Sequence, residues 1–160
     1  MSYENYEKAI KIITKNKHKC YFVGKRSENL IQKAEEILKI KFPNTYKKFL
    51  LTYGAGSYGS QEILGVIDDD FQNSSVPDGV WYTLTDRKQV NLPLNLIVIY
   101  ETGNGEMLCL DVNKLNKENE APVVAYFPGI DNEYQTYEKI ADDFGNFLLD
   151  IVLLEEEYDD

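Results

Sequence analysis

The chain has 160 residues and a formal net charge of −10, from 17 Lys and Arg side chains against 27 Asp and Glu. At this length one domain is the default, and folding a chain of about 150 residues buries roughly 68–70% of its unfolded surface. Hydrophobic residues form 43% of the sequence, which excludes the apolar-poor composition typical of disorder. We therefore expect a globular protein with a substantial core.

Charge is distributed unevenly along the chain. Residues 1–53 hold 12 basic and 5 acidic side chains, a net of +7, whereas residues 54–160 hold 5 and 22, a net of −17. A surface that negative repels phosphate backbones and attracts basic proteins. Arg26 and Arg87 are the only arginines in the sequence, although base readout in nucleic acids favours Arg. The charge pattern therefore favours a basic protein partner over nucleic acid.

The N-terminal third of the chain predicts three helices. Apolar residues over 3–15 recur at three- and four-residue spacings, and Ser27 stands at the N-cap position before a second such pattern over 30–38. Pro43 and Gly54 bracket a third, aromatic helix, as expected of residues that favour the start and the end of helices. Between the first two, the run Cys20–Val23 predicts either a short strand or an extended connector.

The pattern then changes to strands. Short apolar or alternating runs lie between Gly, Pro, Asn or Asp residues and predict four strands, at residues 62–67, 96–100, 106–110 and 123–127. Asn104-Gly105 separates the second of these from the third and predicts an antiparallel hairpin with a type I′ turn, which needs positive φ at both central residues.

Two further helices are predicted after residue 76. Residues 77–90 show a loosely helical spacing between two of the strands, and residues 137–157 carry an amphipathic pattern despite Gly145. Helices, then antiparallel strands, then a helix indicate an α+β fold of two layers, with a largely antiparallel sheet flanked by N-terminal helices and a long C-terminal helix. We expect one domain over residues 1–154 and a frayed acidic tail over residues 155–160.

Two motifs suggest ligand binding, but the residues around them do not match the sites that such motifs form. Gly54–Gly59 matches GxGxxG, but it follows a helix, whereas a dinucleotide site needs a preceding strand, so we predict a helix-terminating turn into a strand. The run Asp68–Asp70 suggests calcium. An EF-hand loop counted from Asp68 needs Gly at its sixth position and Glu at its twelfth, where the sequence has Asn73 and Gly79.

Catalytic patterns are equally weak. His18 is the only imidazole and stands among lysines, and nothing in the sequence places it with a nucleophile and an orienting carboxylate. Cys20 and Cys109 have no metal-ligand or disulfide spacing. We therefore expect no enzyme activity, no catalytic residue, no cofactor and no metal. Residues 1–6 show no leader and no run reaches about 18 apolar residues, so we expect a cytoplasmic protein without a membrane partner.

The order of several motifs resembles the SUKH superfamily. The similar segments span Ser27 to Leu148 and differ at Asp143, where the family has a small hydroxyl residue, and over Asp68–Asn95, which follows no family pattern. They are Phe42-Pro43 with the aromatic helix to Gly54-Ala55-Gly56, Ile63-Leu64-Gly65, Leu110-Asp111, Pro122-Val123-Val124, and Asp143-Phe144-Gly145-Asn146-Phe147-Leu148, which resembles the terminal "SFxxFL" helix.

The resemblance implies a non-catalytic scaffold and a protein partner. Bacterial members are mostly immunity proteins that bind and neutralise a cognate polymorphic toxin, often a nuclease, while fungal relatives resemble cell-wall regulators. The immunity role is our leading hypothesis, with a basic toxin domain as partner and a monomer or weak homodimer as the expected state. The second hypothesis is a regulatory interaction module, and the third is a small ligand-binding or enzyme domain. The partner-contact residues expected after the change in charge are Asp68, Asp69, Asp70, Asp78, Trp81, Tyr82, Glu101 and Glu106.

Overall fold

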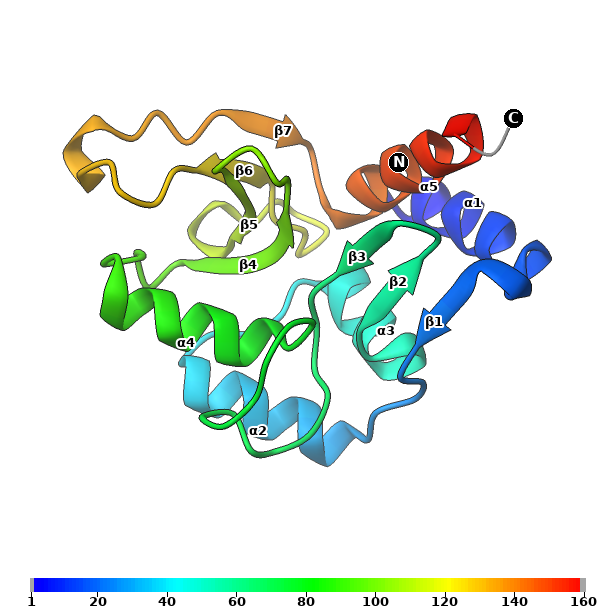
Figure 1. Ribbon diagram of the computed structural model, residues 1–160, viewed down its shortest axis with the longest axis horizontal. Helices are drawn as coiled ribbons and strands as arrows, with labels where there is room; N and C mark the ends of the chain where they lie inside the picture. Colours follow the sequence, from blue (N-terminus) through cyan, green and yellow to red (C-terminus); the bar gives the residue numbers. More distant parts are fainter. Residues whose placement is uncertain (1, 159–160) are drawn as a thin grey trace.

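The computed structural model describes residues 2–158 and shows an α+β fold in which helices surround two antiparallel sheets (Figure 1). The predicted fold class is confirmed, including the long C-terminal helix, and the strands divide between a three-stranded and a four-stranded sheet. The α-helices of the described residues are α1 (Ser2–Lys15), α2 (Glu28–Leu38), α3 (Asn44–Tyr53), α4 (Gly79–Gln89) and α5 (Phe144–Tyr158).

The predicted ends of the first helices are confirmed by their caps. Ser27 Oγ accepts a hydrogen bond from the Leu30 amide at 3.1 Å, which satisfies one of the free donors at the start of α2. Gly54 ends α3 with a φ of 72°, in the left-handed region that glycine adopts without steric cost. Pro43 is the residue before α3 rather than its first residue.

The first sheet follows the order β1-β2-β3 and consists of β1 (Cys20–Phe22), β2 (Gly56–Tyr58) and β3 (Gln61–Ile63). Cys20–Phe22 is therefore a strand, one of the two alternatives left open by the sequence. The GxGxxG segment forms the expected turn from a helix into a strand. Gly56 has a φ of 138° and lies so close to the Tyr21 carbonyl that a Cβ would overlap it, so the pairing of β1 with β2 requires glycine there.

The second sheet follows the order β4-β5-β6-β7, with β4 (Leu96–Glu101), β5 (Met107–Asp111), β6 (Val123–Tyr126) and β7 (Lys139–Ala141). The predicted antiparallel hairpin of β4 and β5 is confirmed. Its turn is not of type I′, because Gly103 and Gly105 have positive φ but Asn104 does not. The Thr102 amide instead donates to the Glu106 carbonyl at 3.3 Å and closes a longer loop.

The C-terminal region differs most from the sequence-based expectation. The helix predicted from residue 137 is wrong in its first residues, because Lys139–Ala141 pairs with β6 as β7 and α5 begins at Phe144. Asp143 Oδ1 accepts from the Asn146 amide at 2.9 Å, as a helix N-cap does. The predicted frayed tail is wrong for residues 155–158, since α5 continues to Tyr158 and Glu155 is only 8% exposed. Residues 159–160 lie outside the described residues.

The core occupies both faces of the second sheet. Ile97, Leu108 and Val123 belong to a large cluster with the aromatic residues of α3 and α5, while their neighbours Val98 and Cys109 belong to a smaller cluster on the other face. Helix α4 packs against β4, and α1 lies beside α5 at the opposite end of the molecule (Figure 1). This arrangement places the acidic loops around α4 and the second sheet.

Candidate protein-interaction surface

The predicted contact residues Asp68–Asp70 lie in the exposed loop between β3 and α4. Asp68 Oδ1 accepts from the Asp70 amide at 3.0 Å, and Asp70 Oδ1 accepts from the Asn73 amide at 3.3 Å. Asp69 Oδ2 lies 3.6 Å from Lys33 Nζ of α2 in an exposed ion pair. These carboxylates are accessible, but each already has a local partner that stabilises the loop.

Asp78 corrects the predicted contact set. Its side chain is fully buried and forms the N-cap of α4, where Oδ1 accepts from the Val80 and Trp81 amides, both at 3.0 Å. Burial raises the pKa of this carboxyl, and the amide hydrogen bonds act in the opposite direction. Asp78 therefore shapes the helix and does not reach the surface on which a partner would bind.

Trp81 lies beside the Asp68–Asp70 loop on the first turn of α4. Its half-buried ring lines a hollow of about 280 Å³ together with Phe71 of the loop, Ile37 of α2 and Leu84 of α4. The ring also contacts that of Tyr82, with 6.2 Å between centroids at 85°. The two predicted aromatic residues therefore contact each other, and both are half-buried.

Tyr82 and Glu101 meet on the other side of α4, where the Tyr82 hydroxyl hydrogen-bonds the Glu101 carboxylate. Asp86 of α4 and Glu62 of β3 add two more carboxyl groups near Glu101. Burial, with a smaller contribution from the Glu101 charge, raises the pKa of Asp86 to about 6, and the same two causes raise the pKa of Glu62. Glu106 is half-buried at the far side of the β4–β5 turn.

The connection between β6 and β7, residues 127–138, is not part of the contact set predicted from the sequence. It carries the exposed side chains of Phe127, Ile130 and Tyr134 together with Asp131, Glu133 and Glu138, and it contains no basic residue. Figure 1 shows it in orange, extending beyond the sheet at the end farthest from both termini. Its signal in the sequence was a cluster of aromatic and acidic residues around Pro128-Gly129, part of which was assigned to the ends of a strand and a helix.

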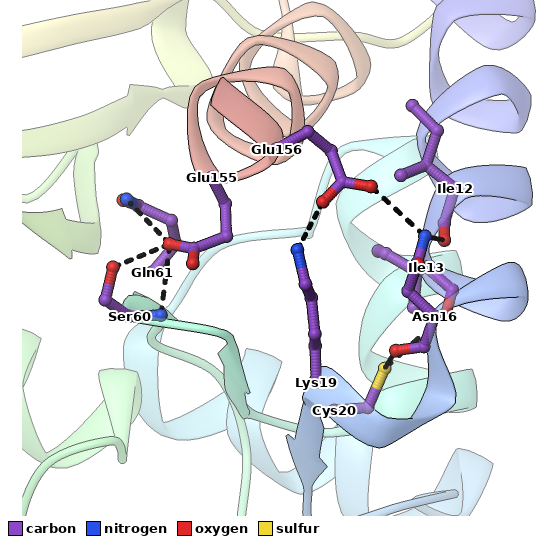
Figure 2. A network of polar contacts seen from close by, with 9 residues as sticks. All are labelled: Ile12, Ile13, Asn16, Lys19, Cys20, Ser60, Gln61, Glu155 and Glu156. Carbon is purple, nitrogen blue, oxygen red and sulfur yellow. Dashed lines mark hydrogen bonds and ion pairs between the residues drawn. The ribbon is translucent and has the colours of Figure 1, made fainter. Parts of the chain in front are cut away.

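The end of α5 forms a polar network with the segment after α1 and with the β2–β3 hairpin (Figure 2). Glu156 Oε2 lies 2.5 Å from Lys19 Nζ, and Glu156 Oε1 accepts from Asn16 Nδ2 at 3.2 Å. The neighbouring Glu155 accepts hydrogen bonds from Ser60 in the β2–β3 turn and from Gln61 at the start of β3. These acidic residues stabilise the fold and are not a free negative tail.

The described residues contain neither a cluster of side chains that could hold a metal ion nor a helix that could span a membrane. Within residues 2–158, no three His, Cys, Asp or Glu side chains come together as a metal site would require. In the same part of the chain, each helix is too short or too polar to cross a bilayer. The residues that sequence analysis placed in the scaffold, such as Tyr46 and Phe144, lie in the core.

Two comparisons with known proteins agree with this architecture. Residues 4–153 match the SUKH_5 family, described as SMI1-KNR4 cell-wall. A crystal structure of a protein from Pseudomonas syringae pv. tomato is similar in fold, with a TM-score of 0.54 and 22% sequence identity over 76% of this chain and 86% of that chain. At that identity the likeness concerns the fold alone. The family match over residues 4–153 includes the acidic loops, α4 and the whole second sheet.

Proposed function

Because the chain belongs to the SMI1-KNR4 family of the SUKH superfamily, we propose that it is an immunity protein that binds and neutralises a cognate toxin in the bacterial cytoplasm. The observation that carries the proposal is the family match over residues 4–153, nearly the whole chain. The toxin is a protein with a basic surface, and nucleases are candidates because their substrate clefts carry positive charge. In this account the protein acts without catalysis, cofactor, metal, nucleic acid or membrane.

The charge distribution supports a basic partner. Residues 54–160 carry a net charge of −17, and several of their exposed carboxylates, including Asp68–Asp70, Asp131 and Glu133, lie on loops around α4 and the second sheet. Complementary charge between two proteins raises association rate constants from about 10⁵–10⁶ to as much as about 10⁸–10⁹ M⁻¹s⁻¹ at low salt. Fast association suits a protein that has to capture a lethal enzyme before it acts.

The test is protection of living cells. The toxin domain encoded directly upstream of this gene is expressed from an inducible promoter, with or without this protein. We expect survival only when both are present, and a stable complex of the two on size-exclusion chromatography. A catalytically inactive toxin serves as the control for expression burden. Cells that die equally fast with and without this protein would reject the immunity function.

A second candidate function is regulation of an endogenous protein. It is favoured by the description of the matching family, SMI1-KNR4 cell-wall. In that case the gene has no toxin gene beside it, and its deletion changes the sensitivity of cells to agents that damage the cell wall. The same acidic surface would then bind a basic region of a cellular protein.

A further inference from the structure

The side chain of Gln135 bridges the two ends of the β6–β7 connection. Gln135 Oε1 accepts from the Phe127 amide at 3.0 Å, while Gln135 Nε2 donates to the Phe127 carbonyl at 2.7 Å and to the Ile130 carbonyl at 2.9 Å. The side chain therefore imitates a strand pairing across the loop and fixes the position of its tip. A loop fixed in this way loses little conformational entropy when it binds a partner.

The same loop is bound to the C-terminal end of α4. Asn132 Nδ2 donates to the Asn91 carbonyl at 2.8 Å. The Tyr126 hydroxyl lies 2.9 Å from Asn132 Oδ1 and 3.0 Å from the Val90 carbonyl. Both sides of the gap between α4 and the loop are therefore anchored to the second sheet.

A hollow of about 570 Å³ lies between these two elements, lined by Gln89, Val90, Asn91, Gly129, Ile130, Asp131, Asn132 and Glu133. The side chains of Asp131 and Glu133 have no hydrogen bond or ion pair with any residue from 2 to 158, and the lining contains no basic residue. Ile130, 46% exposed, lines the hollow beside the two carboxylates, and the same loop exposes Phe127 at 37% and Tyr134 at 70%.

We propose that this hollow binds an Arg or Lys side chain of the basic toxin, with Asp131 and Glu133 pairing its charge and the apolar rim packing against its neighbours. The inference rests on the proposed immunity function and names the surface that performs it. Aromatic side chains beside buried charge pairs are typical centres of binding energy in protein interfaces.

Charge complementarity favours this loop over the surface predicted from the sequence. Asp68, Asp69 and Asp70 already accept or pair within the protein, and Glu101 already accepts from Tyr82. Asp131 and Glu133 would gain a partner without losing one, so binding costs no internal contact. Hydrogen bonds between a carboxylate and a guanidinium are also roughly twice as strong as those between neutral groups.

The experiment measures binding of the upstream-encoded, catalytically inactive toxin domain to the full-length protein by calorimetry. The double variant D131N/E133Q and the single variant Y134A are compared with the wild type. The control E36Q/E157Q removes the same charge from exposed positions that have no ion pair among the described residues. We expect D131N/E133Q to weaken binding at least about tenfold and the control to change it by less than about threefold.

A second measurement does not require the toxin. Titration of the ¹⁵N-labelled protein with N-acetyl-arginine amide should shift the amide signals of Asn91 and Ile130–Glu133 saturably, and D131N/E133Q should abolish this response. Unchanged thermal unfolding of the variants shows that they are folded, as expected for exposed side chains.

The outcomes separate the two proposals. If the toxin binds D131N/E133Q as tightly as the wild type and cells remain protected, the loop inference is wrong and the immunity function stands. If the wild type does not bind the toxin, the proposed function fails, and the loop inference fails with it. A homodimer that D131N/E133Q abolishes would overturn the inference by assigning the hollow to a second copy of this chain.

Discussion

Glu155 accepts two hydrogen bonds from Ser60, at 3.1 Å from the amide and at 2.6 Å from the hydroxyl, so the last turns of α5 are bound to the β2–β3 turn. The turn is shaped for this contact, because Gly59 has a φ of 59° and a Cβ there would overlap the Glu155 carboxylate. The hydrogen bonds from Ser60 hold the pKa of Glu155 below its usual value. The C-terminal helix is thereby fixed to the first sheet.

Removing this contact should destabilise the protein. We expect Glu155→Ala to lower the free energy of unfolding by about 1–3 kcal/mol, because Ser60 loses a charged acceptor at a buried position. Glu157→Ala, two residues further along an exposed part of the same helix, should change it by less than about 0.5 kcal/mol. Urea denaturation of both variants measures the difference, and equal effects would show that the tail is frayed after all.

Asp86 should make stability depend on pH in the opposite direction to an ordinary salt-bridged acid. Its pKa in the folded protein is about 6, above the ordinary value of 3.8, so the folded state binds this proton more tightly than the unfolded state. The contribution of Asp86 is therefore most favourable below about pH 4 and decreases as the pH rises to about 6 and above.

The variant Asp86→Asn isolates this contribution. At pH 7 it should be more stable than the wild type by about 1 kcal/mol, because it removes a negative charge that burial and the nearby Glu101 carboxylate disfavour. The difference should shrink as the pH falls to about 4. Asp69→Asn, at an exposed position, is the control. A constant difference across the pH range would contradict the raised pKa.

Asp78 is predicted to affect the stability of the protein and not its affinity for a partner. Asp78→Ala should cost about 1–2 kcal/mol of stability, because the α4 amides of Val80 and Trp81 lose their acceptor. Under conditions in which the variant is folded, its affinity for the toxin should equal that of the wild type. Thermal unfolding and calorimetry measure the two effects, and a loss of affinity without a loss of stability would restore Asp78 to the contact set.

Gln135 should control the mobility of the β6–β7 loop. In Gln135→Ala the Phe127 amide loses its acceptor, so its hydrogen exchange should accelerate about tenfold or more. Exchange at Val98 of β4, at the edge of the second sheet opposite β7, should be unchanged and serves as the internal control. Unaltered exchange at Phe127 would mean that backbone contacts alone hold the loop.

The sequence allowed the fold class to be predicted because its helices carry clear local signals. Ser27 and Gly54 mark helix ends by their own chemistry, and both act as expected. The strands β2 and β7 were missed because each has only three residues and exists through pairing with distant segments. The turn at Asn104 is not of the predicted type because the last strand pair is Glu101 with Met107, so the connection spans residues 102–106 rather than two residues.

The candidate site was harder to predict than the fold. Composition located the negative charge but could not separate a buried cap such as Asp78 from an exposed carboxylate such as Asp131. The rigidity of the β6–β7 loop depends on the bonds of Gln135 to Phe127 and Ile130, and on Asn132 reaching α4. These contacts are set by tertiary structure, and no local pattern indicates them.

The salt dependence of association with the toxin tests the central claim most directly. We expect the association rate constant, measured by stopped-flow fluorescence, to fall at least about tenfold between about 20 mM and about 500 mM NaCl, because salt screens the attraction between the acidic surface and a basic partner. A rate constant that stays the same over this range, or the absence of any complex, would contradict the account.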